Sequence, residues 1–206
     1  MANKFYLLSS QGIKVEIKEY DGLSVHFSGE NSEICIGEGS VFRNVSIEVG
    51  NDALVEIGKT NAQGIRNSMI RLVGNGGGKF LSFGEGASIM SSKIEILSGI
   101  TNSLKVGLDA MWSEGIHIRN SDSHQIFDIS SGKTINNNGI TEIGNHVWLG
   151  WNVTVLKNTE IADNTIVGME SVVAGKFTEE NVAIAGNPAR IVKRGINWRR
   201  DYLPGQ

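Results

Sequence analysis

The sequence predicts an all-β solenoid, a fold in which short strands wind into stacked coils. Three observations favour it: a six-residue repeat, abundant glycine, and very little proline. Glycine accounts for 26 of the 206 residues and proline for only 2. Glycine and asparagine tolerate left-handed backbone, which a chain that turns a corner every few residues needs. A flexible linker would instead be rich in proline or would cluster its glycines.

The repeat is clearest from Ile143 onward, where the chain reads IGNHVW, LGWNVT, VLKNTE, IADNTI, VGMESV and VAGKFT. The first position of each hexad is aliphatic: Ile143, Leu149, Val155, Ile161, Val167 and Val173. The same column continues upstream at Val106, Trp112 and Ile118. This period belongs neither to a helix nor to simple strand alternation. It predicts three short strands per coil, with the aliphatic column on the axis and successive coils paired in parallel.

The elements follow in order along a single domain, residues 1–206. Residues 1–29 are expected to form an N-terminal strand cap, and residues 30–178 the solenoid. The hexad pattern fails between Ile118 and Ile143, so residues 119–142 are expected to leave the solenoid as a loop. Residues 179–206 would form a C-terminal cap. After Asn187-Pro188 we expect a short helix from Ala189 that covers the open end of the solenoid.

Composition excludes several classes of protein. The net charge of −3 and the pI near 5.8 argue against general nucleic-acid binding, which needs a basic face. The single cysteine, Cys35, is too few for a disulfide framework or a cysteine-based zinc site. No apolar stretch is long enough for a membrane span, and the first residues do not read as a signal peptide. We therefore expect a cytoplasmic protein with no stable membrane insertion.

The loop carries the side chains that suggest chemistry. Asp122 and His124 lie in its polar first half, and Trp148 follows one coil further on. Insertions at solenoid corners usually lie on the functional face. Their spacing is compatible with His124 and Trp148 lying near each other. A histidine suits general base catalysis because its pKa lies near the working pH.

Three segments resemble one family, the hexapeptide-repeat acetyltransferases with a left-handed parallel β-helix. The segments are SDSHQIFD (121–128), IGNHVWLG (143–150) and AIAGNPARIVK (183–193). The resemblance is greatest to the enzymes that O-acetylate capsular polysaccharides such as polysialic acid. Galactoside and maltose acetyltransferases share the last two segments. The polysialic-acid type commonly has proline after the histidine, where this chain has Gln125.

The resemblance implies acetyl transfer from acetyl-CoA to a hydroxyl of a saccharide acceptor, without a metal. It implies that His124 is the general base and that Trp148 lines the acceptor site. A carboxylate such as Asp122 or Glu114 would set the histidine tautomer. It also implies a homotrimer in which each active site lies between two chains. The cofactor residues that it implies are Gly150, Trp151, Met169, Ala174 and Gly175, with Lys176, Arg190 and Lys193 near the CoA phosphates.

Other functions remain open from the residues alone. The acceptor could be the amine of a nucleotide-amino-sugar rather than a hydroxyl. A zinc hydro-lyase of the β-helix carbonic anhydrase type would use His117, His124 and His146, although their spacing does not resemble that family's. A non-catalytic solenoid would show a regular threonine ladder and no histidine-bearing loop. We expect His146 to lie at the surface, outside the site.

Overall fold

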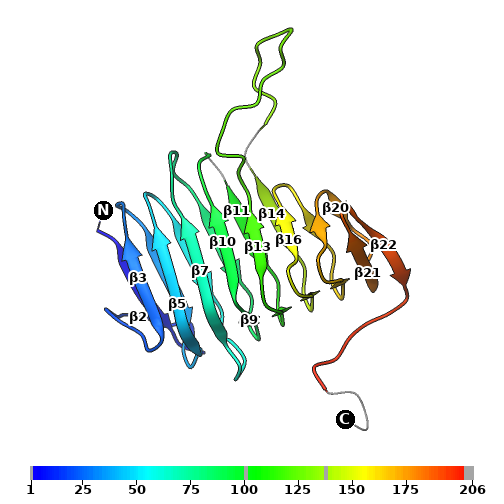
Figure 1. Ribbon diagram of the computed structural model, residues 1–206. Helices are drawn as coiled ribbons and strands as arrows, with labels where there is room; N and C mark the ends of the chain where they lie inside the picture. The colour runs from blue at the N-terminus through cyan, green and yellow to red at the C-terminus, as the bar shows by residue number, and fades with distance from the viewer. Residues whose placement is uncertain (1, 100–101, 137–138, 202–206) are drawn as a thin grey trace.

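The protein is a stack of β-coils that follow one another in a single direction from the N-terminus to the C-terminus (Figure 1). The computed structural model describes residues 2–99, 102–136 and 139–201. Every regular element in these ranges is a strand. Parallel pairing joins equivalent strands of successive coils, so the all-β solenoid expected from the repeat is confirmed. Because this part of the chain contains no helix, it contains none that could cross a membrane.

Three ladders of parallel strands form the faces of the solenoid. The first ladder contains β1 (Lys4–Leu8), β4 (Glu33–Gly37), β6 (Leu54–Ile57), β8 (Phe80–Phe83), β11 (Ser103–Val106), β14 (Ile140–Ile143), β17 (Glu160–Ile161) and β20 (Lys176–Phe177). The second contains β9 (Ser88–Met90), β12 (Met111–Trp112), β15 (Trp148–Leu149), β18 (Ile166–Val167) and β21 (Val182–Gly186). The third contains β3 (Leu23–Phe27), β5 (Phe42–Val49), β7 (Ile65–Leu72), β10 (Ser92–Ile96), β13 (Ile116–Arg119), β16 (Thr154–Leu156) and β19 (Val172–Val173). Each coil passes from the first ladder to the second and then to the third.

The hexads account for the core. All six first-position residues from Ile143 to Val173 are buried on the axis, and so are Val106, Trp112 and Ile118. The fourth position makes the corner: His146, Asn152, Asn158, Asn164 and Glu170 all have φ between 54° and 58°. Only the left-handed region has such angles, and asparagine enters it at less cost than most residues. This explains why asparagine recurs in that column.

The N-terminal segment takes part in the coils. Within residues 1–29, β1 pairs in parallel with β4, and β3 pairs in parallel with β5. The hairpin strand β2 (Lys14–Glu16) pairs antiparallel with β1 at the outer edge of the first ladder. The edge at this end is therefore covered by a short exposed strand in which Lys14 and Glu16 are charged.

The helix expected from Ala189 is wrong. Residues Ala189–Arg194 form β22, which pairs antiparallel with β21 across a tight turn at Asn187-Pro188. Ala189 is buried and Ile191 half-buried, a two-residue alternation that suits a strand on an exposed sheet edge. One edge of β21 pairs with β18, and β22 pairs with the other edge, which would otherwise be open. Residues 202–206 of the expected cap lie outside the described residues.

Candidate functional site

The polar segment between β13 and β14 leaves the solenoid and projects from the corner between the third and first ladders (Figure 1). Residues 137 and 138 of the expected loop lie outside the described residues. The loop contains one isolated bridge, between Phe127 and Thr134. His124 lies at its base beside a cavity of about 230 Å³, which is also lined by Ser98, Asn102, Asn120 and Asn136.

One side of the loop base is held by Asp122. Its carboxylate accepts hydrogen bonds from Lys157 Nζ and from Asn136 Nδ2, the latter at 2.9 Å. The hydrogen bond from Lys157, assisted by that from Asn136, lowers the pKa of Asp122 below its ordinary value. Asn136 Nδ2 also donates to the backbone carbonyl of His124 at 2.7 Å. In the described structure Asp122 thus holds the backbone around His124 and makes no hydrogen bond to the imidazole, so the expected tautomer-setting contact is absent here.

The other side of the loop base is held by Arg119, the last residue of β13. Its Nε donates to the carbonyl of Ser121 at 3.2 Å, and its Nη2 donates to Ser123 Oγ at 2.9 Å. Its Nη1 lies 3.3 Å from the carboxylate of Glu95, a buried residue on β10. Arg119 therefore ties the loop to the third face of the solenoid.

Glu95 is buried, yet it stays ionised. Burial alone would raise its pKa, but hydrogen bonds from His117 and Lys93 and the charge of Arg119 outweigh that effect, so the pKa lies below its ordinary value. Glu95 also stands in register with Arg119 and Arg71 on the neighbouring strands. Opposite charges on adjacent strands stabilise this pairing.

A second, apolar site lies on the second face. Trp148 on β15 is half-buried, and its Nε1 donates to Ser113 Oγ at 3.4 Å. It lines a groove of about 400 Å³ together with Gly150, Trp151, Ile166 and Met169. The exposed fractions of Trp151 and Met169 are 55% and 62%, which is high for side chains of this kind. Three residues expected at the cofactor, Gly150, Trp151 and Met169, therefore do come together.

The basic residues expected at the CoA phosphates separate into two groups. Arg190 and Lys193 lie on β22, which extends the second ladder beyond the groove. Lys176 lies on β20 of the first ladder, where its Nζ is 3.2 Å from the Glu160 carboxylate. Ala174 and Gly175 precede it, at the corner between the third and first ladders. The expected site residues thus occupy two surfaces: the second face, and the corner that also carries the loop.

A single chain does not bring His124 and Trp148 together. The loop leaves the corner where the third ladder passes to the first, whereas Trp148 lies on the second ladder. In a three-sided coil, the face formed by the second ladder lies opposite the corner between the third and first ladders. The two residues also line separate cavities. The expectation that their spacing brings them near each other is therefore not met within one chain.

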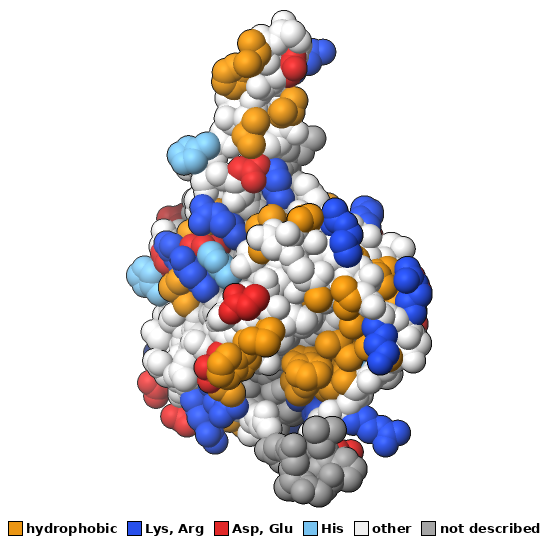
Figure 2. Space-filling view, turned by 45° about the vertical axis from the view of Figure 1, so that its right-hand side comes forward, with side chains coloured by type: hydrophobic (Ala, Val, Ile, Leu, Met, Phe, Trp, Pro, Cys, Tyr) orange, Lys and Arg blue, Asp and Glu red, His pale blue; other side chains and the backbone are white. Residues whose placement is uncertain are grey.

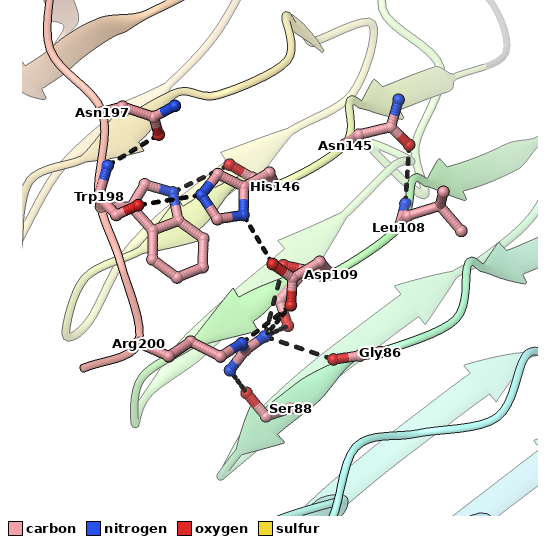
Figure 3. A network of polar contacts seen from close by, with 10 residues as sticks. Gly86, Ser88, Leu108, Asp109, Asn145, His146, Asn197, Trp198 and Arg200 are labelled. Carbon is pink, nitrogen blue, oxygen red and sulfur yellow. Dashed lines mark hydrogen bonds and ion pairs between the residues drawn. The ribbon is translucent and has the colours of Figure 1, made fainter.

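His146 is not the free surface residue expected from the hexad register. Its Nδ1 lies 2.6 Å from Asp109 Oδ2, and its Nε2 lies 3.1 Å from the carbonyl oxygen of Trp198. The imidazole stacks on the Trp198 indole, with ring centroids 3.9 Å apart (Figure 3). No pattern in the sequence indicates this contact, because Trp198 lies beyond the repeat.

The histidines do not gather around a common point. His117 contacts Glu95 on the third face, His146 contacts Asp109, and His124 lies in the loop. Within the described ranges, no three His, Cys, Asp or Glu side chains converge in a way that would hold a metal ion. Nothing in this geometry favours the zinc alternative.

No protein-family model matches the chain. Over 106 residues it is 37% identical to the polysialic acid O-acetyltransferase of Neisseria meningitidis, covering 52% of this chain and 49% of that protein. Over 123 residues it is 32% identical to the polysialic acid O-acetyltransferase of Escherichia coli O1:K1 / APEC, covering 60% and 37%. Over 126 residues it is 32% identical to the putative lipopolysaccharide biosynthesis O-acetyl transferase WbbJ of Escherichia coli K12, covering 55% and 63%. The chain thus spans less than two thirds of the length of each of these relatives.

Two solved structures share the fold over nearly the whole chain. The crystal structure of the polySia-specific acetyltransferase NeuO has a TM-score of 0.72 and 26% identity, covering 97% of this chain and 86% of that one. The polysialic acid O-acetyltransferase OatWY has a TM-score of 0.61 and 24% identity, covering 100% and 93%. Fold and repeat together define a hexapeptide-repeat solenoid. The resemblance of this chain to the hexapeptide-repeat acetyltransferases, and to the polysialic acid O-acetyltransferases in particular, is confirmed.

Proposed function

We propose that the protein is an acetyl-CoA-dependent O-acetyltransferase that acts on a hydroxyl of a bacterial surface saccharide. The observation that supports this most is the placement of a histidine on a projecting loop and of an aromatic groove on the opposite face of the coil. The relatives that match the chain are named as O-acetyltransferases. The coils would wind in the left-handed sense of the β-helix that the hexads resemble. The reaction would take place in the cytoplasm, where acetyl-CoA is available.

His124 would act as the general base. Its imidazole takes the proton from the acceptor hydroxyl, whose oxygen then attacks the thioester carbonyl of acetyl-CoA. The tetrahedral intermediate collapses by breaking the carbon–sulfur bond, and the proton passes from the imidazolium to the departing thiolate. The products are the acetyl ester and free CoA. The indole N–H of Trp148 and a backbone N–H at a coil corner would be the donors for the oxyanion, and the Trp148 face would receive a sugar ring.

The complete site would form between two chains of a homotrimer. When the loop corner of one chain meets the second face of the next, His124 approaches the Trp148 groove of its neighbour. The same contact brings Ala174, Gly175 and Lys176 of one chain toward Gly150, Trp151 and Met169 of the other. All of these expected site residues then lie at one interface, which a single chain does not achieve.

Exposed apolar side chains support this assembly. The loop carries Ile126, Phe127, Ile129 and Ile135, all at least half exposed, and hydrophobic side chains are visible on the projecting loop in Figure 2. Several exposed apolar side chains on one short loop usually mark a contact surface. On a second copy of the chain, the exposed Trp151 and Met169 would be the apolar side chains that this loop contacts.

Cofactor binding would run along the second ladder. Pantetheine would lie in the apolar groove beside Trp148, and the CoA phosphates would reach Lys193 and Arg190 on β22. No metal is needed for this reaction, because the base and the oxyanion donors come from the chain.

The test is an acceptor screen with purified protein and acetyl-CoA, in which a thiol reagent reports released CoA. The panel includes a sialic acid polymer, neutral capsular polysaccharides, simple galactosides and a nucleotide-amino-sugar. We expect thiol release that depends on a saccharide hydroxyl acceptor, with one acetyl ester formed per thiol. Acceptor-dependent release only with the amine acceptor would contradict O-transfer, and no acceptor-dependent release at all would contradict the proposed function.

A further inference from the structure

The C-terminal tail, residues 197–201, folds back over the corner between the first and second ladders (Figure 3). Arg200 fastens it by five contacts on two successive coils. Its guanidinium donates to Asp109 Oδ1 at 2.8 Å, to Ser88 Oγ at 2.6 Å and to the carbonyl oxygens of Gly86, Asp109 and Ala110. A guanidinium that uses its whole fork in this way is a rigid anchor.

Trp198 is the residue that this anchor holds in place. The exposed fraction of Trp198 is only 7%. The His146 imidazole stacks on its ring, and the Arg200 guanidinium lies 5.6 Å from the ring centroid. The two residues His146 and Trp198 are also bonded reciprocally. Trp198 Nε1 donates to the backbone carbonyl of His146 at 2.9 Å, and the His146 imidazole reaches the Trp198 carbonyl.

The same indole reaches Trp148. The ring centroids of Trp148 and Trp198 lie 6.2 Å apart, with an angle of 57° between the ring planes. Trp198 itself is not among the residues that line the groove. Along its ladder Trp148 has Met111 and Ile166 as neighbours. Trp198 adds an aromatic neighbour, held beside His146 at the corner between the first and second ladders.

We propose that Trp198, anchored by Arg200, is a positioning residue that fixes the orientation of the Trp148 side chain at the wall of its groove. The effect of this positioning on turnover rests on the proposed function. An indole on an open face has several accessible rotamers, and an aromatic neighbour at this distance and tilt selects one of them. The tail therefore acts on the groove through Trp148, the side chain that it contacts.

Two measurements test the proposal separately from the enzymatic function. The first is ¹⁹F NMR of the full chain labelled with 5-fluorotryptophan, with the Trp148 line assigned by Trp148→Phe. Arg200→Ala is the informative variant, because it releases the anchor without altering either indole. Arg200→Lys tests the fork geometry, and Trp198→Phe keeps an aromatic ring. Arg199→Ala is the matched control, since Arg199 is exposed and forms no hydrogen bond or ion pair with another described residue.

We expect the Trp148 line to broaden or split in Arg200→Ala, to recover partly in Arg200→Lys, and to stay sharp in Arg199→Ala. A sharp, single Trp148 line in both Arg200→Ala and Trp198→Phe would overturn the proposal, whether or not the protein is an acetyltransferase. Melting temperatures of the same samples establish that each variant is folded.

The second measurement is steady-state kinetics with the acceptor found in the screen. We expect Arg200→Ala and Trp198→Phe to lower kcat/KM for the acceptor by about tenfold while KM for acetyl-CoA stays within about twofold of wild type. A purely structural tail would lower the melting temperature and leave kcat/KM unchanged, which contradicts the proposal. If wild-type protein transfers no acetyl group, the proposed function fails, and the NMR result still decides the role of Trp198.

Discussion

Lys193 and Trp148 stand in the same outward-facing column of the second ladder. Trp148 pairs with Ile166, Ile166 pairs with Ala183, and Ala183 pairs with Lys193. Three strand spacings separate them, or roughly 14 Å. An ammonium group at one end of an apolar column and an indole at the other suit a long ligand with phosphates at one end and a reactive group at the other.

Removing the Lys193 charge should therefore weaken acetyl-CoA binding. We expect Lys193→Ala to raise KM for acetyl-CoA about fivefold, the effect of roughly 1 kcal/mol from one exposed ionic contact, with kcat unchanged. Lys105→Ala is the control, because Lys105 lies on β11 of the first ladder and pairs with Glu142. Initial rates at varied acetyl-CoA concentration give both constants. An unchanged KM in Lys193→Ala would place the phosphates elsewhere.

His124→Ala should abolish most of the catalysis and little of the stability. We expect kcat to fall by roughly 10²–10⁴, the usual contribution of a general base, while CoA binding and the melting temperature persist. His146→Ala is not a suitable control, because His146 holds the C-terminal tail. His26→Ala serves instead, since His26 is exposed on β3, far along the stack. Full activity in His124→Ala would remove this histidine from the mechanism.

The Asp122 carboxylate should make the loop base sensitive to acid. The pKa of Asp122 is lowered in the folded protein by Lys157 and Asn136, so the ionised form stabilises the loop base above the ordinary carboxyl pKa. That stabilisation is lost as the pH falls through the lowered pKa. We expect protection of the Ile126 amide, which donates to Asn136, to be constant from about pH 8 to pH 5 and to decrease at more acidic pH.

Amide hydrogen exchange, corrected for the intrinsic rate at each pH, measures that protection. Asp122→Asn should lower it already at neutral pH, and the remaining protection should no longer respond to acid in this range. Equal protection in the wild type and in this variant at neutral pH would show that Asp122 does not hold the loop.

The fourth hexad position should tolerate glycine and reject β-branched residues. Asn164 has φ of 57°, in the left-handed region. We expect Asn164→Val to lower the free energy of unfolding by about 1–2 kcal/mol, because the second γ-carbon on the branched Cβ crowds the backbone in that conformation, which the short polar side chain of asparagine tolerates. Asn164→Gly should change it by less than about 1 kcal/mol. Urea unfolding of both variants gives the comparison, and equal values for the two would contradict the corner assignment.

Much of the fold follows from the sequence because each coil repeats the same local rules. One aliphatic residue per hexad reaches the axis, and one left-handed residue turns the corner, so the columns from Ile143 to Val173 could be identified by inspection. The C-terminal strand could not. From Ala189 the chain is too short for a helical or strand period to stand out, and the pairing of β22 depends on a sheet edge that only the assembled solenoid presents.

Part of the geometry of the candidate site follows from the sequence for the same reason. Gly150, Trp151 and Met169 lie in the repeat, so their neighbours in space follow from the register. Arg119, Lys157 and Asn136 hold the loop through contacts between distant parts of the chain, and no local pattern marks them. The sequence also does not indicate that His124 and Trp148 lie on opposite sides of the coil. Spacing along the chain does not determine the side of the coil from which a loop projects.

The most direct test of the shared site is complementation between two inactive variants. His124→Ala and Trp148→Ala are each purified, unfolded together and refolded as a mixture, and the acceptor-dependent release of CoA is compared with that of each variant refolded alone. If His124 of one chain serves the Trp148 groove of the next, an equal mixture should regain about a quarter of the wild-type activity, because random assembly makes that share of the interfaces complete. Activity no greater than the mean of the two separate variants, in mixtures that light scattering shows to be assembled, would contradict a site shared between chains.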